Sequence, residues 1–459
     1  LRMTHGQNRA GVTQFGDGSA MPKCENLGKA YPEVHALGAK VKILKATFPF
    51  FSPGALKGWA GVCLAVLAPV AAQAATVPAT GYAPNELLAN VRVDLLDSEF
   101  SQSRNMFTWC DYQGHLWVGK VDPATGNIIT PTYKLIDSAA ITPTEMGITT
   151  NGPEWVSTST GDHIVYTKFV AGQTASAKTA RLAYAQLNAD GSVSSVTVLG
   201  PDLPRNAPYA SDDEGDANPR ISYVDQYNRH YWRYLNDETS ETKVKGMKAT
   251  PKPVSVRFVR GSNALVYSQD VNGVKQVFML KMDSGKLTQI TTDDGDKDLR
   301  TVPWMWSAPE FNGKLVLMTT VNETELRFYR MMDQDGDGVS TWTLFRTITM
   351  PAGTTVASPE PFTYNGKSYV SLALTQTSNG FPSSIWLGTV NPKNAAFWKV
   401  SDDSSLRVRM DPEVYITDNG PVVFYNRFDP SKATGDQPPW CGDCSEGLFR
   451  ATSGILPTN

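Results

Sequence analysis

The stretch that decides the fold is ALVYSQDVNGVKQVFMLKMDSGKLTQIT, residues 264–291. It holds three short runs in which aliphatic, β-branched and aromatic residues predominate. The pairs Asn272-Gly273 and Ser284-Gly285 separate these runs, and such pairs are typical of hairpin turns. The stretch therefore predicts consecutive antiparallel strands joined by tight turns.

The same rhythm recurs along the chain as a repeat. Each unit opens on a Pro with a polar or charged neighbour, passes through a Gly, Asn or Asp turn and continues into an apolar run. Weaker copies begin near Met106 and Val254. Seven copies of about 55 residues predict an all-β fold, a single β-propeller in which seven blades are favoured over six. The alternative is two stacked β-sandwich domains, which would make the repeated openings a coincidence. The clear openings are Gly152-Pro-Glu-Trp155, Asn218-Pro-Arg-Ile221, Ala308-Pro-Glu-Phe311, Ser358-Pro-Glu-Pro361 and Asp411-Pro-Glu-Val414.

The N-terminal segment has the composition of an export signal. Several lysines after residue 39 precede an apolar stretch, Trp59–Ala72, which ends in Ala72-Gln-Ala74. A basic region, a short apolar region and a small-residue cleavage site are the parts of a secretory signal peptide. An ordinary buried helix is the alternative. We expect residues 1–74 to be an upstream leader with a cleaved signal peptide, residues 75–459 to form the propeller domain, and the protein to be exported to the periplasm or outside the cell.

Composition excludes several classes of protein. The formal net charge is −3, and the predicted leader is basic, so the part after residue 74 carries 34 Lys and Arg against 42 Asp and Glu. No dense Lys/Arg stripe is present that would neutralise a nucleic-acid backbone. No run of about 18 apolar residues is present that would span a bilayer. We therefore expect no nucleic-acid partner, no membrane span, and a monomer that binds a small molecule or a glycan.

Three cysteines follow the predicted leader, namely Cys110, Cys441 and Cys444. Export would permit disulfides. A local bridge between Cys441 and Cys444 would pin their Pro-rich loop. Alternatively, Cys110 in the first blade pairs with one of the other two, because the first and last blades of a propeller are neighbours, and this bridge would latch the ring.

The repeat with residues 264–291 resembles the blades of TolB-like propellers, within the WD40-like superfamily. The shared pattern is an apolar run ending in Val-Tyr-Ser, a second run ending in Asp-Ser-Gly, and a closing Leu-Thr-Gln-Ile-Thr. This resemblance implies the propeller fold and says little about activity.

The Pro-Glu openings supply the candidate catalytic residues. By propeller convention the innermost strand of each blade starts at the functional face, so we expect Glu154, Glu310, Glu360 and Glu413 to converge on one mouth of the channel. Carboxyls confined together raise each other's pKa, which suits division into an acid and a base. Alternatively, Pro-Glu is only a strand-entry device. The expected substrate-binding residues at this mouth are Arg220, Asp411, Trp155, Trp306, Asn426 and Arg427.

Aromatic walls with carboxylates and amides suit sugars. The openings also resemble those of propeller glycosidases, in which a Glu at such a position serves as the acid; Glu310 and Glu413 are favoured for that role. The sequence therefore favours a secreted glycoside hydrolase that uses general acid/base catalysis on a poly- or oligosaccharide, with no certain cofactor. The alternatives are a Ca²⁺-dependent esterase, lactonase or phosphotriesterase, a non-catalytic TolB-like binding propeller, and, less favoured, a uronate lyase.

Overall fold

A computed structural model provides the structure, and the described residues all belong to one of its two units, Ala72–Asn459. The predicted leader and its cleavage site lie outside the described residues. The described residues are 77–90, 92, 95–111, 113–140, 151–158, 161–170, 173–211, 218–249, 255–292, 300–333, 340–376, 382–435 and 437–457.

This unit consists of seven four-stranded antiparallel sheets. Six sheets use four consecutive strands, whereas the seventh recruits its fourth strand from the N-terminal side of the chain. From the innermost strand outward the blades are: blade 1, β2 (Leu95–Ser101), β3 (Met106–Asp111), β4 (Leu116–Val121) and β5 (Ile128–Asp137); blade 2, β6 (Glu154–Thr158), β7 (Gly161–Phe169), β8 (Ala180–Leu187) and β9 (Val193–Leu199); blade 3, β10 (Arg205–Ala210), β11 (Arg220–Asp225), β12 (His230–Tyr234) and β13 (Thr242–Lys243); blade 4, β14 (Val256–Phe258), β15 (Ala264–Val271), β16 (Val274–Lys281) and β17 (Lys286–Gln289); blade 5, β18 (Arg300–Ala308), β19 (Lys314–Val321), β20 (Glu325–Met332) and β21 (Thr341–Thr349); blade 6, β22 (Thr354–Tyr364), β23 (Lys367–Gln376), β24 (Ser383–Thr389) and β25 (Phe397–Lys399); blade 7, β26 (Val408–Thr417), β27 (Gly420–Phe428), β28 (Ser445–Thr452) and β1 (Leu87–Asn90).

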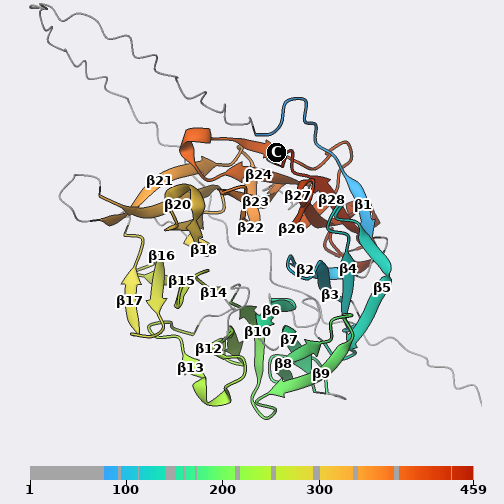
Figure 1. Ribbon diagram of the computed structural model, residues 1–459, viewed down its shortest axis with the longest axis vertical. Helices are drawn as coiled ribbons and strands as arrows, with labels where there is room; N and C mark the ends of the chain where they lie inside the picture. Colours follow the sequence, from blue (N-terminus) through green and yellow to red (C-terminus); the bar gives the residue numbers. More distant parts are fainter. Residues whose placement is uncertain are drawn as a thin grey trace, which may run out of the picture. The chain divides into compact units, whose positions relative to one another are not determined.

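The innermost strands close into a ring. Each of β2, β6, β10, β14, β18, β22 and β26 contacts the next, and β26 returns to β2. Figure 1 shows these strands around the centre with the outer strands at the periphery. The described helices are five short 3-10 turns, η1 (Glu238–Ser240), η2 (Pro309–Phe311), η3 (Pro392–Asn394), η4 (Pro430–Lys432) and η5 (Gly442–Cys444). The predicted seven-bladed all-β propeller is confirmed, and the alternative of two β-sandwiches is wrong.

The apolar residues of each blade pack mainly against the neighbouring blades. One buried cluster joins Val316 and Phe328 of blade 5 to Val370 and Leu372 of blade 6. Burial of both faces of a sheet explains why the inner strands read as near-continuous apolar runs in the sequence. The interfaces between blades therefore form the core that holds the ring together.

The first strand completes the last blade. Strand β1 pairs antiparallel with β28, which places the blue strand beside the red one in Figure 1. Gly447 of β28 has a φ of 98°, and a Cβ there would collide with the Asn90 carbonyl oxygen, so this approach requires glycine. A strand from one end of the chain thus fastens the other end.

An ionic cluster anchors this closing strand. Directly before β1, the Glu86 carboxylate accepts hydrogen bonds from Arg409 Nε at 2.6 Å, Arg427 Nη1 at 2.8 Å and the Tyr425 hydroxyl at 2.9 Å. The Glu86 side chain is 8% exposed and that of Arg409 1%. We call Glu86, Arg409, Tyr425 and Arg427 the closure cluster.

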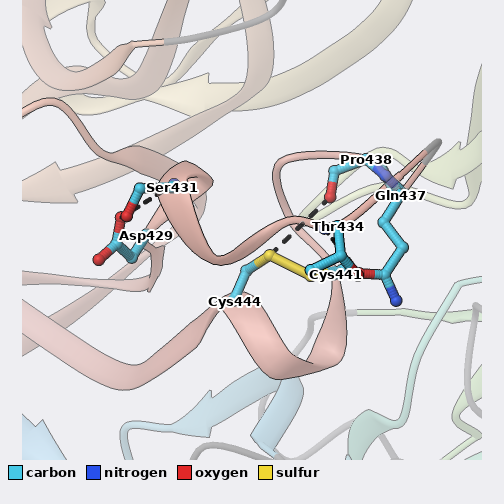
Figure 2. The surroundings of a disulfide bond; sticks show 7 residues. All are labelled: Asp429, Ser431, Thr434, Gln437, Pro438, Cys441 and Cys444. Atoms are coloured by element: carbon cyan, nitrogen blue, oxygen red, sulfur yellow. Dashed lines mark hydrogen bonds between the residues drawn. A yellow bond between two sulfur atoms is a disulfide. The ribbon is translucent and has the colours of Figure 1, made fainter.

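The disulfide is local and does not join the blades. Cys441 and Cys444 are bonded to each other, at the start and end of the η5 turn. In Figure 2 the pair lies beside the Pro438 carbonyl and near the Thr434–Gln437 contact of the same loop. Cys110 is a buried thiol in β3. The interpretation of Cys110 as a latch is therefore wrong, because the closure cluster and β1 hold the two ends together.

Candidate functional site

A repeated irregularity in the innermost strands determines which side chains face the channel. In five blades the pairing with the second strand shifts by an inserted residue that has a positive φ. Such a β-bulge bends its strand and redirects the side chains beside it. The inserted residues are Asp97, Ala207, Val302, Ser358 and Asp411.

In each of the five blades with a bulge, the residue two positions after the inserted one lines a central cavity. Blades 2 and 4 have no such bulge in their described strands, but the innermost strand of each also contributes to this lining. One residue comes from each blade, and each pairs directly with a residue of the second strand. We call these seven the channel ring: Glu99, Glu154, Tyr209, Arg257, Trp304, Glu360 and Glu413.

The cavity has a volume of about 580 Å³, within the range of small-molecule sites. Apart from the ring and Ser371, its lining residues come after the ring residue in their own strands or just beyond them, as Phe100, Gln102 and Arg260 do. The cavity therefore extends from the ring toward the ends of the innermost strands. The sequence placed the predicted glutamates at the starts of these strands; Glu154 does begin β6, whereas Glu360 and Glu413 lie in the middle of β22 and β26.

The ring is chemically divided into two arcs. Going round from blade 6 through blades 7 and 1 to blade 2, Glu360, Glu413, Glu99 and Glu154 form a continuous run of four carboxyls. We call this run the carboxyl arc. Blades 3 to 5 supply Tyr209, Arg257 and Trp304 instead, and the Arg257 guanidinium lies 3.6 Å from the Trp304 ring centroid and 4.9 Å from that of Tyr209. One side of the channel is thus acidic, and the other is aromatic and cationic.

The surroundings make the carboxyls of the arc weak acids. Burial is the main cause that raises the pKa of Glu413 well above the usual glutamate range, and repulsion from Glu360 adds to it. Burial likewise raises the pKa of Glu99 well above that range, followed by repulsion from Glu154. Because ionising one carboxyl opposes ionisation of the next, protonated and ionised carboxyls coexist in the arc.

A further pair of acidic residues, Asp97 and Asp411, lies two positions before the ring residues of blades 1 and 7. Burial, then the charge of Asp411 and a hydrogen bond to it, raises the pKa of Asp97 well above its usual range. Burial also raises the pKa of Asp411, although hydrogen bonds to Asp97 and Ser358 oppose this. Asp97 is thus the weaker acid of this hydrogen-bonded pair. Gly152 of the next blade packs so closely on Asp97 that no Cβ would fit there.

Three of the four predicted catalytic glutamates meet in the arc, namely Glu154, Glu360 and Glu413. Glu310 does not join them, because it lies in η2, the turn after β18, where its carboxylate accepts hydrogen bonds from the Ser368 backbone N–H at 3.1 Å and hydroxyl at 2.9 Å. Trp304 holds the ring position of that blade. The predicted place of Glu310 at the mouth is wrong.

The predicted substrate-binding residues also lie outside the cavity lining. Arg220, in the second strand of blade 3, bonds to Asn263 Oδ1 at 2.8 Å. Asp411 lies two positions before the ring residue of its strand, as described above, and Arg427 belongs to the closure cluster.

The remaining predicted residues pack against their own blade or the neighbouring one. The Trp155 indole donates to the Glu99 carbonyl at 3.0 Å, and the Trp306 indole donates to the Ser368 hydroxyl at 3.0 Å. Asn426 is buried on β27 opposite Met410. These side chains do not line the cavity, and the two tryptophans instead pack into the apolar clusters between blades.

Sequence reasoning missed Tyr209 because it aligned the wrong proline of that blade, and it missed Glu99 and Arg257 because no proline precedes them. The residue before the ring position is proline in five blades: Pro153, Pro208, Pro303, Pro359 and Pro412. Aligning Pro208 and Pro303 in place of Pro219 and Pro309 would have found Tyr209 and Trp304. Blades 1 and 4 have Ser98 and Val256 at this position, so only spacing from their neighbours could reveal Glu99 and Arg257.

Two features are absent from the described residues, a cluster of metal ligands and a membrane-spanning helix. In the part of the chain that the structure describes, no group of three or more His, Cys, Asp or Glu side chains is placed to hold a metal ion. No helix among the described residues is long and apolar enough to cross a membrane.

Comparison with known proteins gives likeness of structure only. No protein-family model matches the chain, and no curated protein matches it. Among solved structures, the β-propeller domain of Myceliophteria thermophila Cps50 (Swd1) is 8% identical with a TM-score of 0.48, over 81% of this chain and 99% of that one. TolB from Acinetobacter baumannii is 14% identical with a TM-score of 0.35, over 75% and 78% of the two chains. BBS1N, solved in complex with ARL6DN, is 11% identical with a TM-score of 0.40, over 64% and 77%. The chain is similar to TolB and WD40-type propeller domains, and its own strand pairing defines it as a seven-bladed β-propeller.

Proposed function

We propose that the protein is a glycoside hydrolase whose reaction takes place at the carboxyl arc. The observation that carries this proposal is the position of Glu413, which lines the cavity at 9% exposure and has Glu360 as its strongest electrostatic neighbour. Glycosidases cleave with a pair of carboxyls, one protonated and one ionised. A buried carboxyl with a raised pKa beside a second carboxyl meets that requirement.

In this proposal Glu413 is the general acid. Because burial raises its pKa, this carboxyl holds its proton to higher pH than an ordinary glutamate, and it gives that proton to the glycosidic oxygen as the bond to the anomeric carbon breaks. Glu360 is the ionised partner, which acts either on that carbon directly or on a water molecule. Glu154 and Glu360 supply the negative charge that stabilises the oxocarbenium-like transition state in this proposal. Phe100, Phe258 and Phe362 provide apolar surface along the cavity for sugar faces.

The test is hydrolysis of a panel of polysaccharides by the purified protein and by Glu413→Gln. We expect turnover by the wild type and a loss of about 10²- to 10⁴-fold in kcat for the variant. The matched control is Glu310→Gln, the same chemical change outside the cavity, which should keep full activity. Equal losses in both variants, or no turnover on any glycan, would refute the proposal.

The same assay separates the two rival functions. A Ca²⁺-dependent esterase or lactonase would lose activity in chelator, whereas acid/base hydrolysis by the arc is insensitive to it. A binding propeller would retain glycans in the cavity without turnover. Neither outcome is expected here, because the proposed reaction needs only the carboxyls of the arc.

A further inference from the structure

Several buried carboxylates among the described residues outside the channel have cationic partners. Asp137 bonds to Lys168 Nζ at 2.7 Å, Asp225 to Arg229 at 2.6 Å, and Glu86 to the arginines of the closure cluster. Such pairing offsets the cost of removing a charge from water. The fold therefore compensates its structural carboxylates internally.

Glu413 lacks such compensation. Its carboxyl is nine-tenths buried, lines the cavity, and forms no hydrogen bond or ion pair with any described residue. The neighbouring Glu99 side chain, which is half-buried, also lines the cavity and forms no hydrogen bond or ion pair with a described residue. Arg257, on the opposite wall, forms no ion pair with a described carboxylate and instead lies over Trp304 and Tyr209. Glu413 and Glu99 thus place two carboxyl groups at the cavity without a cationic partner among the described residues.

From this contrast we propose that the substrate of the channel is cationic, a glycan of amino sugars whose ammonium groups bind in the carboxyl arc. The glycan part rests on the proposed function, while the positive charge rests on Glu413, Glu99 and the arc alone. An ammonium group offers three N–H donors, which can bridge neighbouring carboxyls such as those of Glu413 and Glu99. A cavity of about 580 Å³ admits an oligosaccharide rather than a bare ion.

An organic cation fits the arc better than a metal ion does. A resident divalent ion needs several carboxylate oxygens converging within about 2.6 Å of one point. The described residues contain no such group of three or more ligating side chains. Carboxyls spread around the ring on four blades suit charges spaced along a chain of sugars.

Calorimetry with two matched probes tests the charge. A short oligomer of glucosamine carries an ammonium on every sugar, and its N-acetylated counterpart has the same backbone without the charge. We expect the charged oligomer to bind at least about 10-fold more tightly, with affinity that falls as salt is added. Binding should also release protons, seen as a heat that changes with the ionisation enthalpy of the buffer, because the ammonium groups favour ionised carboxyls. Equal affinity for both oligomers, or preference for the acetylated one, would overturn the proposal.

Variants locate the binding to the arc. Glu413→Gln and Glu99→Gln should each weaken the charged oligomer by about 5- to 10-fold and leave the acetylated one unchanged. Glu310→Gln should change neither. If Ca²⁺ alone binds at the arc and the charged oligomer does not compete with it, the proposal is wrong.

The two proposals fail separately. Tight binding of the charged oligomer without cleavage would refute hydrolysis and support the cationic ligand. Cleavage restricted to neutral glycans would refute the cationic substrate and leave the hydrolase in place.

Discussion

Two buried glutamates of this propeller have opposite surroundings. Glu86 meets two arginines and a tyrosine hydroxyl within 2.9 Å, at the seam where β1 completes blade 7. Glu413, in the innermost strand of the same blade, has three carboxyls around it in the arc and no described bonding partner. Burial costs both side chains their hydration, but only Glu86 recovers it within the fold. The difference separates a carboxylate that stabilises the protein from one arranged at the expense of stability.

We expect the largest loss of stability from removing Glu86, the glutamate with cationic partners. Glu86→Ala leaves Arg409 buried at 1% side-chain exposure without its counter-ion. We expect the free energy of unfolding to fall by about 3–5 kcal/mol. Denaturant titration measures it, and Glu238→Ala in the exposed η1 turn is the control. A change below about 1 kcal/mol would mean that β1 holds without the closure cluster.

The Cys441–Cys444 disulfide should also stabilise blade 7, but by less than Glu86 does. The Cys441–Cys444 bridge closes a very short loop, so its removal in a Cys441→Ser, Cys444→Ser variant should cost roughly 2 kcal/mol, less than the loss of Glu86. Thermal unfolding with and without reductant provides the measurement. A larger loss than that of Glu86→Ala would reverse this order.

Replacing Glu413, the glutamate without a cationic partner, should stabilise the protein and not destabilise it. Because the folded pKa of Glu413 is raised, the folded state holds a proton that the unfolded chain has lost, and stability falls as pH rises from the ordinary glutamate pKa toward the raised one. Glu413→Gln removes this loss. We expect no difference from the wild type near pH 3 and a stabilisation of about 1–2 kcal/mol at neutral pH. Melting temperatures across this pH range test the sign; a destabilised variant at neutral pH would contradict it.

The smallest effect is expected at Glu310. Its carboxylate accepts two hydrogen bonds from Ser368, and Gln keeps an acceptor for one of them. Glu310→Gln should therefore cost under about 1 kcal/mol at any pH between 5 and 8. A pH-dependent gain like that of Glu413→Gln would mean that the two glutamates share an environment, against the present placement.

The fold could be predicted from the sequence more fully than the site could. Alternating apolar runs and Gly turns determine strands, and their repetition determines blades, so both are readable locally. A channel position depends on register, and one bulge shifts every following residue to the other face of its strand. The Pro-Glu pair correctly identified the ring residue in blades 2, 6 and 7. In blades 6 and 7 its proline directly follows the inserted residue of the bulge, and in blade 2 it directly precedes β6. At Ala308-Pro-Glu310 the same letters form a turn, because proline also suits the start of a 3-10 helix.

The closure by β1 has a consequence for how the chain folds. Leu87 pairs with Arg450, so the last blade cannot be completed until nearly the whole chain has been synthesised. Until then, blade 7 lacks its outer strand and Arg409 lacks Glu86. Contacts this distant in sequence form slowly, because loop closure precedes any stabilisation from them. The rate-limiting event of folding should therefore be the docking of β1, and variants at the closure cluster should slow refolding more than variants within a blade.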